Sequence, residues 1–592
     1  MEDEALNLCK ARTKTFLRIA PPLVLLILAI VFARVVQLKI APNSKLASVV
    51  GSPMSSRPEM ARRGDLLDRH GRIISTSTMG YRLFVDPSLV TDPDTIAVDL
   101  GVLLEVDPVN IDRKLQPRLD KRYVVIAPLL EDWQVEAVRA ADLPGVGIEM
   151  RQVRQQPNGS LGIALVGFVG SEHTGLSGAE YAFQEDLAGA NGKLTYLRDA
   201  RRRALWIEPD GYTPSSDGQD IQITIDLVLQ QYVQERLQEE VRKRHAAGGR
   251  LVLADCTTGE ILATYAVLDP PADRKEIERE KPVHPALMRN RCVTDPYEPG
   301  STFKPFVWAT ATALGRADPK EMLQTPTSTG YRTDTGRLVR DAHYYGPSNW
   351  TKVLIKSMNS GMAIVAQRMT FQEMQGTVGR FGFGRLTHCG FSGESAGLVT
   401  QKKNWNQYTQ VSVAMGHEIA VTPVQMARAF MAIARDGTMP QLRLTPANDN
   451  EAVMLDRAIP AWVALQTRQV LERVMTEGTG RRATSEKYRL FGKSGTAQLP
   501  KPKGGGYFED RYISSFIAGA PASNPRLVAI CVIDDPQRSK GYYGGTVAGP
   551  VVRDVLDHAL GYLGVMPDQP GTEEQDQPSL TAQAVRPSLS NP

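Results

Sequence analysis

An uncharged apolar run near the amino terminus is the feature that most constrains this chain. The run extends from Ile19 to Ala33, and its apolar character continues across Arg34 to Leu38. As a helix, the stretch from Phe16 to Leu38 would reach roughly 35 Å, enough to span a bilayer if Arg34 extends to the far interface. We therefore predict a transmembrane anchor over 16–40.

Basic residues on one side of the run predict its orientation. Four of them precede it, namely Lys10, Arg12, Lys14 and Arg18. Because cytoplasmic flanks of membrane helices are enriched in Lys and Arg, we expect a cytoplasmic tail over 1–15 and an outer, periplasmic or extracellular location for the later residues. A cleavable signal peptide is the alternative. The run is long for a secretory signal, however, and no small-x-small cleavage site lies directly behind it.

Composition indicates a globular protein attached to this anchor. A chain of 592 residues with 42% hydrophobic residues can form about two to four folded units. Its 69 basic and 65 acidic residues leave a net charge of +4 without a basic run that would suggest nucleic acid. The five cysteines show neither a C-x-x-C pair nor zinc-ligand spacing with histidines. We therefore expect no metal site and no cofactor.

Local patterns divide the rest of the chain into two folded parts and a tail. From 41 to 217, short strand-like and helical patches alternate with Pro and Gly, which predicts an accessory, pedestal-like domain. From 218 to 565 we predict a compact α+β domain, because strand candidates lie on both sides of helical sequence and can share one sheet. These candidates are 250–266, 512–518 and 527–533. The segment 566–592 is rich in Pro, Gln, Ser and Glu, and we expect it to be disordered.

The first of three short motifs is Ser301-Thr302-Phe303-Lys304, at the start of a predicted helix over 301–314. A serine and a lysine three positions apart share one helical face. Ser301 can therefore be a nucleophile and Lys304 the base that takes its proton, provided that burial and nearby cations keep the lysine neutral. The backbone N–H of Ser301, at the helix N-terminus, is a candidate oxyanion donor.

The second motif, Ser357-Met358-Asn359, lies between a helical stretch at 350–356 and another that starts near 361. Short polar side chains in such a loop can point into a cleft. We expect Ser357 to relay a proton between Lys304 and a leaving amine, and the Asn359 amide to hold a substrate carbonyl.

The third motif, Lys493-Ser494-Gly495-Thr496, follows a strand-like entry at 488–491. Lys493 would supply positive potential, and the hydroxyls of Ser494 and Thr496 would bind a terminal carboxylate. Gly495 permits close approach of a ligand to the backbone. The Thr496 N–H would complete the oxyanion hole that Ser301 begins.

Each motif is weak by itself. An isolated S-x-x-K is usually a capping serine beside a solvated lysine, an isolated S-x-N is a helix cap, and an isolated K-S-G-T is a turn. Here they occur in a fixed order, at a helix start, in an inter-helix loop and on a strand. Together they indicate an active-site serine enzyme that acts on penicillin-like acyl groups.

With these motifs, the chain resembles the class B penicillin-binding proteins, and most of all their division-specific (FtsI-type) transpeptidases. Further segments that carry the resemblance are 294–300, 416–418, 422–425 and 542–550 in the catalytic part, and 63–65, 68–71 and 175–180 in the pedestal. The resemblance covers about 60–565. Two departures are Ser-Met-Asn, where the family commonly has a second Ser, and Gly-Leu-Ser-Gly-Ala-Glu, where Gly-Leu-Glu is usual. The second departure bears on pedestal packing.

The resemblance implies the penicillin-binding transpeptidase fold, a central antiparallel sheet between helices, with 493–496 on the strand that borders the cleft and an elongated pedestal. It implies that Ser301 attacks the penultimate D-Ala carbonyl of a peptidoglycan stem ending in D-Ala-D-Ala. An amine of a neighbouring stem would accept the acyl group, and β-lactams would acylate the same serine. A SEDS-family glycan polymerase and other divisome membrane proteins would be its partners.

Several alternatives remain open at this point. The chain could be an elongation-type class B transpeptidase rather than a septal one. A hydrolase, either a D,D-carboxypeptidase or a β-lactamase, would need a positioned water and a base for deacylation, and no motif in the sequence indicates them. A penicillin-sensing receptor or an inactive scaffold is the non-enzyme alternative, although every chemical group that catalysis needs is present.

Overall fold

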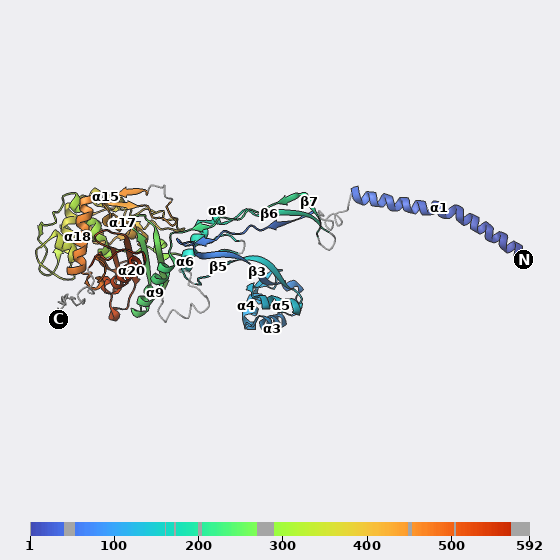
Figure 1. The fold of residues 1–592 in the computed structure, drawn as a ribbon, viewed down its shortest axis with the longest axis horizontal. Helices are drawn as coiled ribbons and strands as arrows, with labels where there is room; N and C mark the ends of the chain where they lie inside the picture. The colour runs from blue at the N-terminus through green and yellow to red at the C-terminus, as the bar shows by residue number, and fades with distance from the viewer. Residues whose placement is uncertain are drawn as a thin grey trace, which may run out of the picture. The chain divides into compact units, whose positions relative to one another are not determined.

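The computed structural model describes residues 2–40, 54–159, 161–170, 173–198, 204–268, 289–447, 453–501 and 505–569 (Figure 1). The chain divides into two compact units. The first comprises Met1–Ala61 and Ala190–Asp217, and the second comprises Arg62–Gly189 and Gly218–Pro592. The chain therefore leaves the second unit after Gly189 and returns to it at Gly218.

In the first unit, the apolar run forms part of a long helix, α1 (Glu2–Ile40). Its segment Ile19–Ile40 has a mean hydropathy of 2.6, and none of it is buried inside the protein. An exposed apolar helix of this length has the properties of a membrane span. The helix begins at Glu2, so it also includes most of the predicted tail over 1–15.

The first unit also contains a three-stranded antiparallel sheet in the order β1-β6-β7. Strand β1 (Met54–Glu59) pairs with β6 (Gly192–Arg198), and β6 pairs with β7 (Ala204–Thr213). Segments that are far apart in the sequence meet here because the backbone groups of an isolated strand need partners.

The amino-terminal part of the second unit is built around one long strand, β3 (Ile73–Val85). It pairs with β2 (Leu66–Leu67), β4 (Val124–Leu130) and β5 (Val146–Gln155). The helices of this part are α3 (Pro93–Leu104), α4 (Pro108–Leu115) and α5 (Asp132–Ala141), followed by the short helices α6 (Ile163–Val166), α7 (Gly178–Ala182) and α8 (Gln184–Leu187). Asp side chains cap α3 and α4, and Pro occupies the first position of each, as helix starts prefer.

A buried ion-pair cluster explains the unusual Gly-Leu-Ser-Gly-Ala-Glu segment. Its last residue, Glu180, is fully buried. The Glu180 carboxylate accepts hydrogen bonds from Arg63 Nε at 2.8 Å, from Arg154 Nε at 2.7 Å and from Ser75 Oγ at 3.0 Å. The segment therefore still delivers a glutamate to Arg63, which belongs to another of the pedestal segments that carry the resemblance.

The carboxy-terminal part of the second unit contains a five-stranded sheet in the order β10-β9-β21-β20-β19. The strands are β9 (Gly248–Asp255), β10 (Ile261–Leu268), β19 (Phe491–Pro500), β20 (Tyr507–Ala520) and β21 (Leu527–Asp534). All four pairings are antiparallel. The predicted α+β domain is confirmed, with the early hairpin and the late strands in one sheet.

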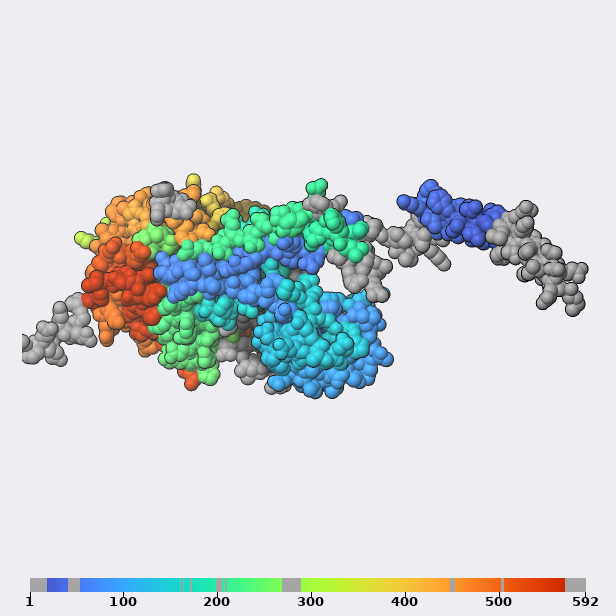
Figure 2. All heavy atoms as spheres, turned by 45° about the vertical axis from the view of Figure 1, so that its right-hand side comes forward, coloured from blue at the N-terminus to red at the C-terminus, as the bar shows by residue number. Residues whose placement is uncertain are grey.

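Both faces of this sheet are covered by helices. Along β9, Leu251 and Leu253 belong to the core shared with α9 (Leu227–Lys243) and α20 (Gly549–Tyr562), whereas Val252 and Ala254 belong to the core of the opposite face. This alternation follows from the two-residue period of a strand. Helices α9 and α20 contact each other and lie close together in Figure 1. In Figure 2 the green surface of the region that includes α9 adjoins the red surface of the carboxy-terminal region.

The opposite face is covered mainly by helices between β10 and β19. These are α11 (Arg291–Thr294), α12 (Lys304–Ala313), α13 (Trp350–Ile355), α14 (Asn359–Arg368), α15 (Phe371–Arg380), α16 (Gln407–Ala414), α17 (Pro423–Ala434) and α18 (Ala461–Glu477). Every residue of α17 is buried, and ten of its twelve side chains are apolar, the exceptions being Gln425 and Arg428, as expected for a helix surrounded by protein.

Short strand pairs connect these helices. They are β11 (Met322–Leu323) with β14 (Ser348–Asn349), β12 (Tyr331–Arg332) with β13 (Leu338–Val339), β15 (Leu398–Val399) with β16 (Ile419–Ala420), and β17 (Thr438–Pro440) with β18 (Leu455–Arg457). A further two-residue strand, β8 (Ile221–Gln222), pairs in parallel with β2.

At the carboxy terminus, ordered contacts continue into the segment predicted to be a disordered tail. The Asp568 carboxylate accepts hydrogen bonds from the Arg489 backbone N–H at 2.6 Å and from Ser523 Oγ at 2.8 Å. The rest of the predicted tail, 570–592, lies outside the described residues.

Candidate active site

Ser301 lies in a 3₁₀ turn (Gly300–Phe303) immediately before α12. The sequence predicts one continuous helix over 301–314, so its first turn is tighter than expected. Tight turns of this kind are common at helix N-termini. Pro305 is tolerated in the first turn of α12 because N–H groups there have no intrahelical partner. Ser301 is partly exposed, whereas Lys304 is fully buried.

Two glycines allow this turn to pack closely against its neighbours. A Cβ atom on Gly495 of β19 would lie 2.7 Å from the carbonyl oxygen of Pro299 and 3.0 Å from Thr302 Cγ2. A Cβ atom on Gly416 would lie 2.0 Å from the carbonyl oxygen of Gly300. The Gly300 N–H in turn donates a hydrogen bond to the carbonyl oxygen of Gly416 at 3.0 Å. The position of Ser301 relative to β19 therefore depends on the absence of side chains at these sites.

Lys304 points from α12 into the second motif. Its Nζ donates hydrogen bonds to the carbonyl oxygen of Ser357 at 2.7 Å, to Asn359 Oδ1 at 2.7 Å and to Ser357 Oγ at 3.4 Å. Burial lowers the pKa of Lys304 to about 7, and the negative charge of Asp341 opposes this shift. Near neutral pH a large fraction of this lysine is uncharged and can accept a proton.

The second motif connects α13 to α14, which begins at Asn359 rather than near 361. Ser357 has a φ of +59°, in the left-handed region that residues other than glycine seldom adopt. Its Oγ accepts a hydrogen bond from Lys493 Nζ at 2.8 Å, so the hydroxyl lies between two lysines. A strained backbone held in this way is typical of functional sites.

Asn359 has a structural role that sequence reasoning did not foresee. Its Oδ1 accepts from Lys304, and its Nδ2 donates to the carbonyl oxygen of Arg340 at 2.9 Å. The amide therefore orients the lysine. Its predicted contact with a substrate carbonyl stays a prediction.

The third motif lies within β19, which begins at Phe491, so the predicted entry at 488–491 mostly precedes the strand. Lys493 is fully buried, and its Nζ also donates to the carbonyl oxygen of Ser494 at 2.9 Å. Burial and the nearby Lys304 charge hold the pKa of Lys493 well below its usual value. A second proton on this lysine pair is therefore unfavourable.

The two hydroxyls of the third motif are partly exposed and already have partners. Ser494 Oγ donates to Thr479 Oγ1 at 2.7 Å, and Thr496 Oγ1 accepts from the Gly544 N–H at 3.1 Å. The Thr496 hydroxyl proton is thus available to an incoming anion. Within the described residues β19 is an edge strand of its sheet, so alternate N–H groups face away from β20. That arrangement suits the predicted oxyanion role of the Thr496 N–H.

Glu298, His417 and Tyr507 lie near the site, and no role was predicted for them from the sequence. Glu298 accepts hydrogen bonds from the Glu418 N–H and from Tyr507 Oη, both at 3.0 Å, and pairs with His417 Nδ1 at 3.1 Å. These contacts join the segment before Ser301 to β20. Burial and the Glu298 carboxylate raise the pKa of Tyr507. Glu298 and His417 fall in segments 294–300 and 416–418, and this was the only sequence signal for them.

The cysteines that the structure describes show no sign of reactivity. Cys256, Cys292, Cys389 and Cys531 are buried and unpaired, and burial raises the pKa of each thiol. In the part of the chain that the structure describes, no group of three His, Cys, Asp or Glu side chains could hold a metal ion.

Comparison with known proteins agrees with this geometry. The penicillin-binding protein transpeptidase domain model matches residues 249–557, and the penicillin-binding protein dimerisation domain model matches residues 58–223. The chain is 30% identical to peptidoglycan D,D-transpeptidase FtsI of Escherichia coli (strain K12), over 94% of this chain and 93% of the relative. It is also 30% identical to stage V sporulation protein D of Bacillus subtilis (strain 168), over 93% of this chain and 86% of that relative.

A solved structure shows the same fold. Penicillin-binding protein 3 from Mycobacterium tuberculosis, complexed with aztreonam, is 26% identical, with a TM-score of 0.65 over 87% of this chain and 99% of that one. The resemblance derived from the motifs is therefore confirmed over most of the sequence. The chain belongs to the penicillin-binding protein family, with a dimerisation domain followed by a transpeptidase domain.

Proposed function

We propose that this protein is a serine-type peptidoglycan D,D-transpeptidase that crosslinks stem peptides. The observation that carries the proposal is the convergence of all three motifs. Lys304 of the first motif binds Ser357 and Asn359 of the second, and Lys493 of the third binds the same Ser357 hydroxyl. Names of relatives that span almost the whole chain support the same reaction.

The proposed acylation begins at Ser301. Neutral Lys304 takes the hydroxyl proton as Ser301 Oγ bonds to the penultimate D-Ala carbonyl carbon of a stem peptide. The N–H groups of Ser301 and Thr496 would hold the oxyanion. When the intermediate collapses, the peptide C–N bond breaks. The proton then passes from Lys304 through Ser357 to the leaving amine of the terminal D-Ala.

The third motif would bind the carboxylate of the substrate. Lys493 lies one residue before Ser494 and adds positive potential, and the hydroxyls of Ser494 and Thr496 are the partly exposed donors beside it. An amine of a second stem then attacks the acyl-serine ester, loses a proton to the lysine–serine pair and restores free Ser301. A β-lactam would occupy the same place as the D-Ala-D-Ala end.

The proposed cellular setting follows from α1 and from the relatives. We propose a single-pass protein of the inner (plasma) membrane, with a cytoplasmic amino terminus and an outer catalytic domain, because basic residues precede the apolar segment. The FtsI name of one relative favours a role in septal wall synthesis. We further propose a SEDS-family glycan polymerase and other divisome membrane proteins as its partners. Elongation-type transpeptidation is the second candidate.

Labelling with a fluorescent penicillin tests the enzyme proposal. The wild-type protein should form a covalent adduct that Ser301→Ala abolishes, while Ser523→Ala, which removes an exposed serine hydroxyl elsewhere, labels normally. Labelling of Ser301→Ala at the wild-type rate would refute the assignment of the nucleophile.

A second assay separates transfer from hydrolysis. The purified protein is given a D-Ala-D-Ala stem peptide together with a labelled D-amino acid as the acceptor. Incorporation of the label supports transpeptidation, whereas release of the shortened stem alone would make the protein a D,D-carboxypeptidase.

Uniform wall localisation of a tagged chain through the cell cycle would overturn the septal assignment.

A further inference from the structure

We propose that Asp341 is a positioning residue of this site: it fixes the turn that carries Ser357 and Asn359, and through that turn the hydrogen bonds of Lys304. This inference rests on the proposed function. Asp341 belongs to none of the three motifs and follows β13 in the sequence.

Asp341 is almost fully buried, with 8% of the residue surface exposed. Its carboxylate accepts a hydrogen bond from the backbone N–H of Asn359, another from the Ser360 N–H at 2.9 Å, and a third from Ser360 Oγ. These groups form the start of α14, whose own N-cap residue, Met358, provides no side-chain cap. Asp341 therefore acts as a cap supplied from a distant part of the chain.

Arg340, the neighbour of Asp341 in the sequence, also binds the Asn359 side chain. The carbonyl oxygen of Arg340 accepts from Asn359 Nδ2 at 2.9 Å, which leaves Oδ1 to receive Lys304 Nζ at 2.7 Å. Residues 340 and 341 thus hold both the backbone and the amide of Asn359. This double contact explains how the turn keeps Ser357 at a positive φ, which costs about 1 kcal/mol or more for a residue with a side chain.

Asp341 also acts on Lys304 through its charge. The other charged neighbour on this hydroxyl is Lys493, which shares Ser357 Oγ with Lys304 and whose own pKa the Lys304 charge lowers. Burial lowers the pKa of Lys304, and the Asp341 charge raises it. Removing that charge should therefore lower the pKa of Lys304 further and leave more neutral base at acid pH.

Two substitutions separate geometry from charge. Asp341→Asn keeps the shape and a carbonyl acceptor but removes the charge. Asp341→Ala removes both. Asp334→Asn is the matched control, because this exposed aspartate lies in the β12–β13 hairpin of the same segment. The rate of penicillin labelling is measured against pH for each purified full-length variant.

We expect Asp341→Asn to move the acid limb of the profile to lower pH by about one unit, while Asp334→Asn leaves the limb in place. On the plateau above the acid limb, Asp341→Ala should lower the rate by about tenfold or more. An acid limb that stays at the wild-type pH in Asp341→Asn, or a wild-type rate in Asp341→Ala, would overturn the proposal.

Hydrogen exchange gives a readout that does not depend on activity. The Asn359 and Ser360 amides, which donate to Asp341, should exchange faster in Asp341→Ala than in the wild type or in Asp334→Asn. Unchanged exchange would refute the positioning role even if the protein proved not to bind penicillin. Failure of wild-type labelling, by contrast, would refute only the proposed function.

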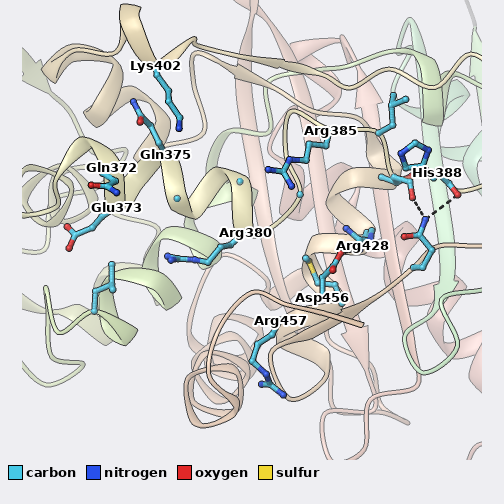
Figure 3. A pocket seen from close by; sticks show the side chains of 18 of the residues that line it. Gln372, Glu373, Gln375, Arg380, Arg385, His388, Lys402, Arg428, Asp456 and Arg457 are labelled. Atoms are coloured by element: carbon cyan, nitrogen blue, oxygen red, sulfur yellow. Dashed lines mark hydrogen bonds and ion pairs between the residues drawn. The ribbon is translucent and has the colours of Figure 1, made fainter. Parts of the chain in front are cut away.

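A second inference comes from a pocket that shares no residue with the three motifs. It has a volume of about 1020 Å³ and is lined by α15, the loop after α15, Arg428 of α17 and strands β17 and β18. Figure 3 shows the side chains of Arg380, Arg385 and Lys402 extending from three different segments around it. Within the described residues, none of these three cations has an ion-pair partner.

The carboxylates of this pocket are already engaged. Asp456 pairs with Arg428 at 2.6 Å, and Glu373 pairs with Arg316 at 2.5 Å. The unpaired cations therefore favour an anionic ligand, and arginine forks suit carboxylates in particular. The volume fits a ligand larger than a single inorganic anion. The amide side chains of Gln372 and Gln375 can bind peptide groups, whereas the Gln441 amide nitrogen already donates to the carbonyl oxygens of Thr387 and His388.

We infer that the pocket binds a short carboxylate-bearing peptide. With the proposed function, stem peptides of the wall polymer are its source. A second stem site would keep the polymer close to the catalytic domain by multivalency.

Titration with a synthetic stem peptide tests this site on the Ser301→Ala protein. Binding should weaken at least tenfold in an Arg380→Ala/Arg385→Ala variant and with rising salt. It should persist in Lys403→Ala, which removes an exposed charge beside Lys402 but outside the pocket. Equal binding by all variants would overturn the inference. Equally tight binding of inorganic phosphate or of the amidated peptide would show an unselective anion site and refute the peptide assignment. Neither result depends on penicillin labelling.

Discussion

Lys493 Nζ donates a 2.8 Å hydrogen bond to Ser357 Oγ and so joins two motifs that lie 136 positions apart in the sequence. Lys304 Nζ lies 3.4 Å from the same oxygen. One hydroxyl is thus shared by two buried lysines, and burial lowers the pKa of both. A proton can pass along this chain over short distances, which is what the proposed acylation and its leaving-group step require.

The first prediction concerns pH. Because the pKa of Lys304 is lowered to about 7, the lysine is protonated below that pH and neutral above it. The rate constant of penicillin labelling should therefore fall about tenfold for each pH unit below the pKa and level off above it. A rate that does not change across the neutral range would argue against Lys304 as the base. Lys304→Ala should lower the rate constant of labelling about a hundredfold or more.

The second prediction concerns the Ser357–Lys493 pair. Ser357→Ala and Lys493→Ala should each slow labelling strongly, and the double variant should be little worse than the slower single variant. The reason is that both changes interrupt one proton path, and residues acting as a unit are not additive. A double-mutant cycle of labelling rates measures the coupling. Purely additive losses would show that the two groups act separately.

The third prediction concerns Gly495. An alanine Cβ here would lie 2.6 Å from Ser515 Oγ and 2.7 Å from the Pro299 carbonyl oxygen. The turn that carries Ser301 must shift, at a cost of about 1–3 kcal/mol in folding free energy, and labelling should slow at least tenfold.

Gly561→Ala is the control for Gly495. Gly561 lies in α20, and a Cβ atom there would meet nothing within 4 Å. The free energy of unfolding of this variant should rise by about 0.5–1 kcal/mol, and penicillin should label it at the wild-type rate. Normal labelling of Gly495→Ala would contradict the proposed close packing.

The fourth prediction concerns the buried cluster around Glu180. Glu180→Gln leaves Arg63 and Arg154 without their carboxylate partner, and loss of one partner from a buried pair costs about 3–5 kcal/mol. Urea denaturation should show the loss. Glu477→Gln removes the partner of Arg473 in an exposed pair and should cost no more than about 0.5 kcal/mol. Equal denaturation midpoints for the two variants would contradict the role assigned to Glu180.

Some elements were readable from the sequence because their signals are local. The hairpin at 250–266 has two apolar stretches around a turn, and the late strand candidates fall within β20 and β21. Short motifs with the right order and local setting predicted that Ser301, Lys304 and Lys493 belong to one site, and their chemical roles stay a prediction. The 3₁₀ turn at Ser301 and the start of β19 were placed inaccurately, because tertiary contacts decide where such elements begin.

The sequence by itself determined the apolar amino-terminal segment, the order of the two domains and the candidate reactive side chains, since each depends on residues close together in the chain. Only the tertiary structure decided that Asp341 caps α14, that Asn359 orients Lys304 and that Glu298 holds the segment before Ser301. Hydrogen bonds between residues far apart leave no periodic or local signal. Their partners are defined only when the packed core brings the segments together.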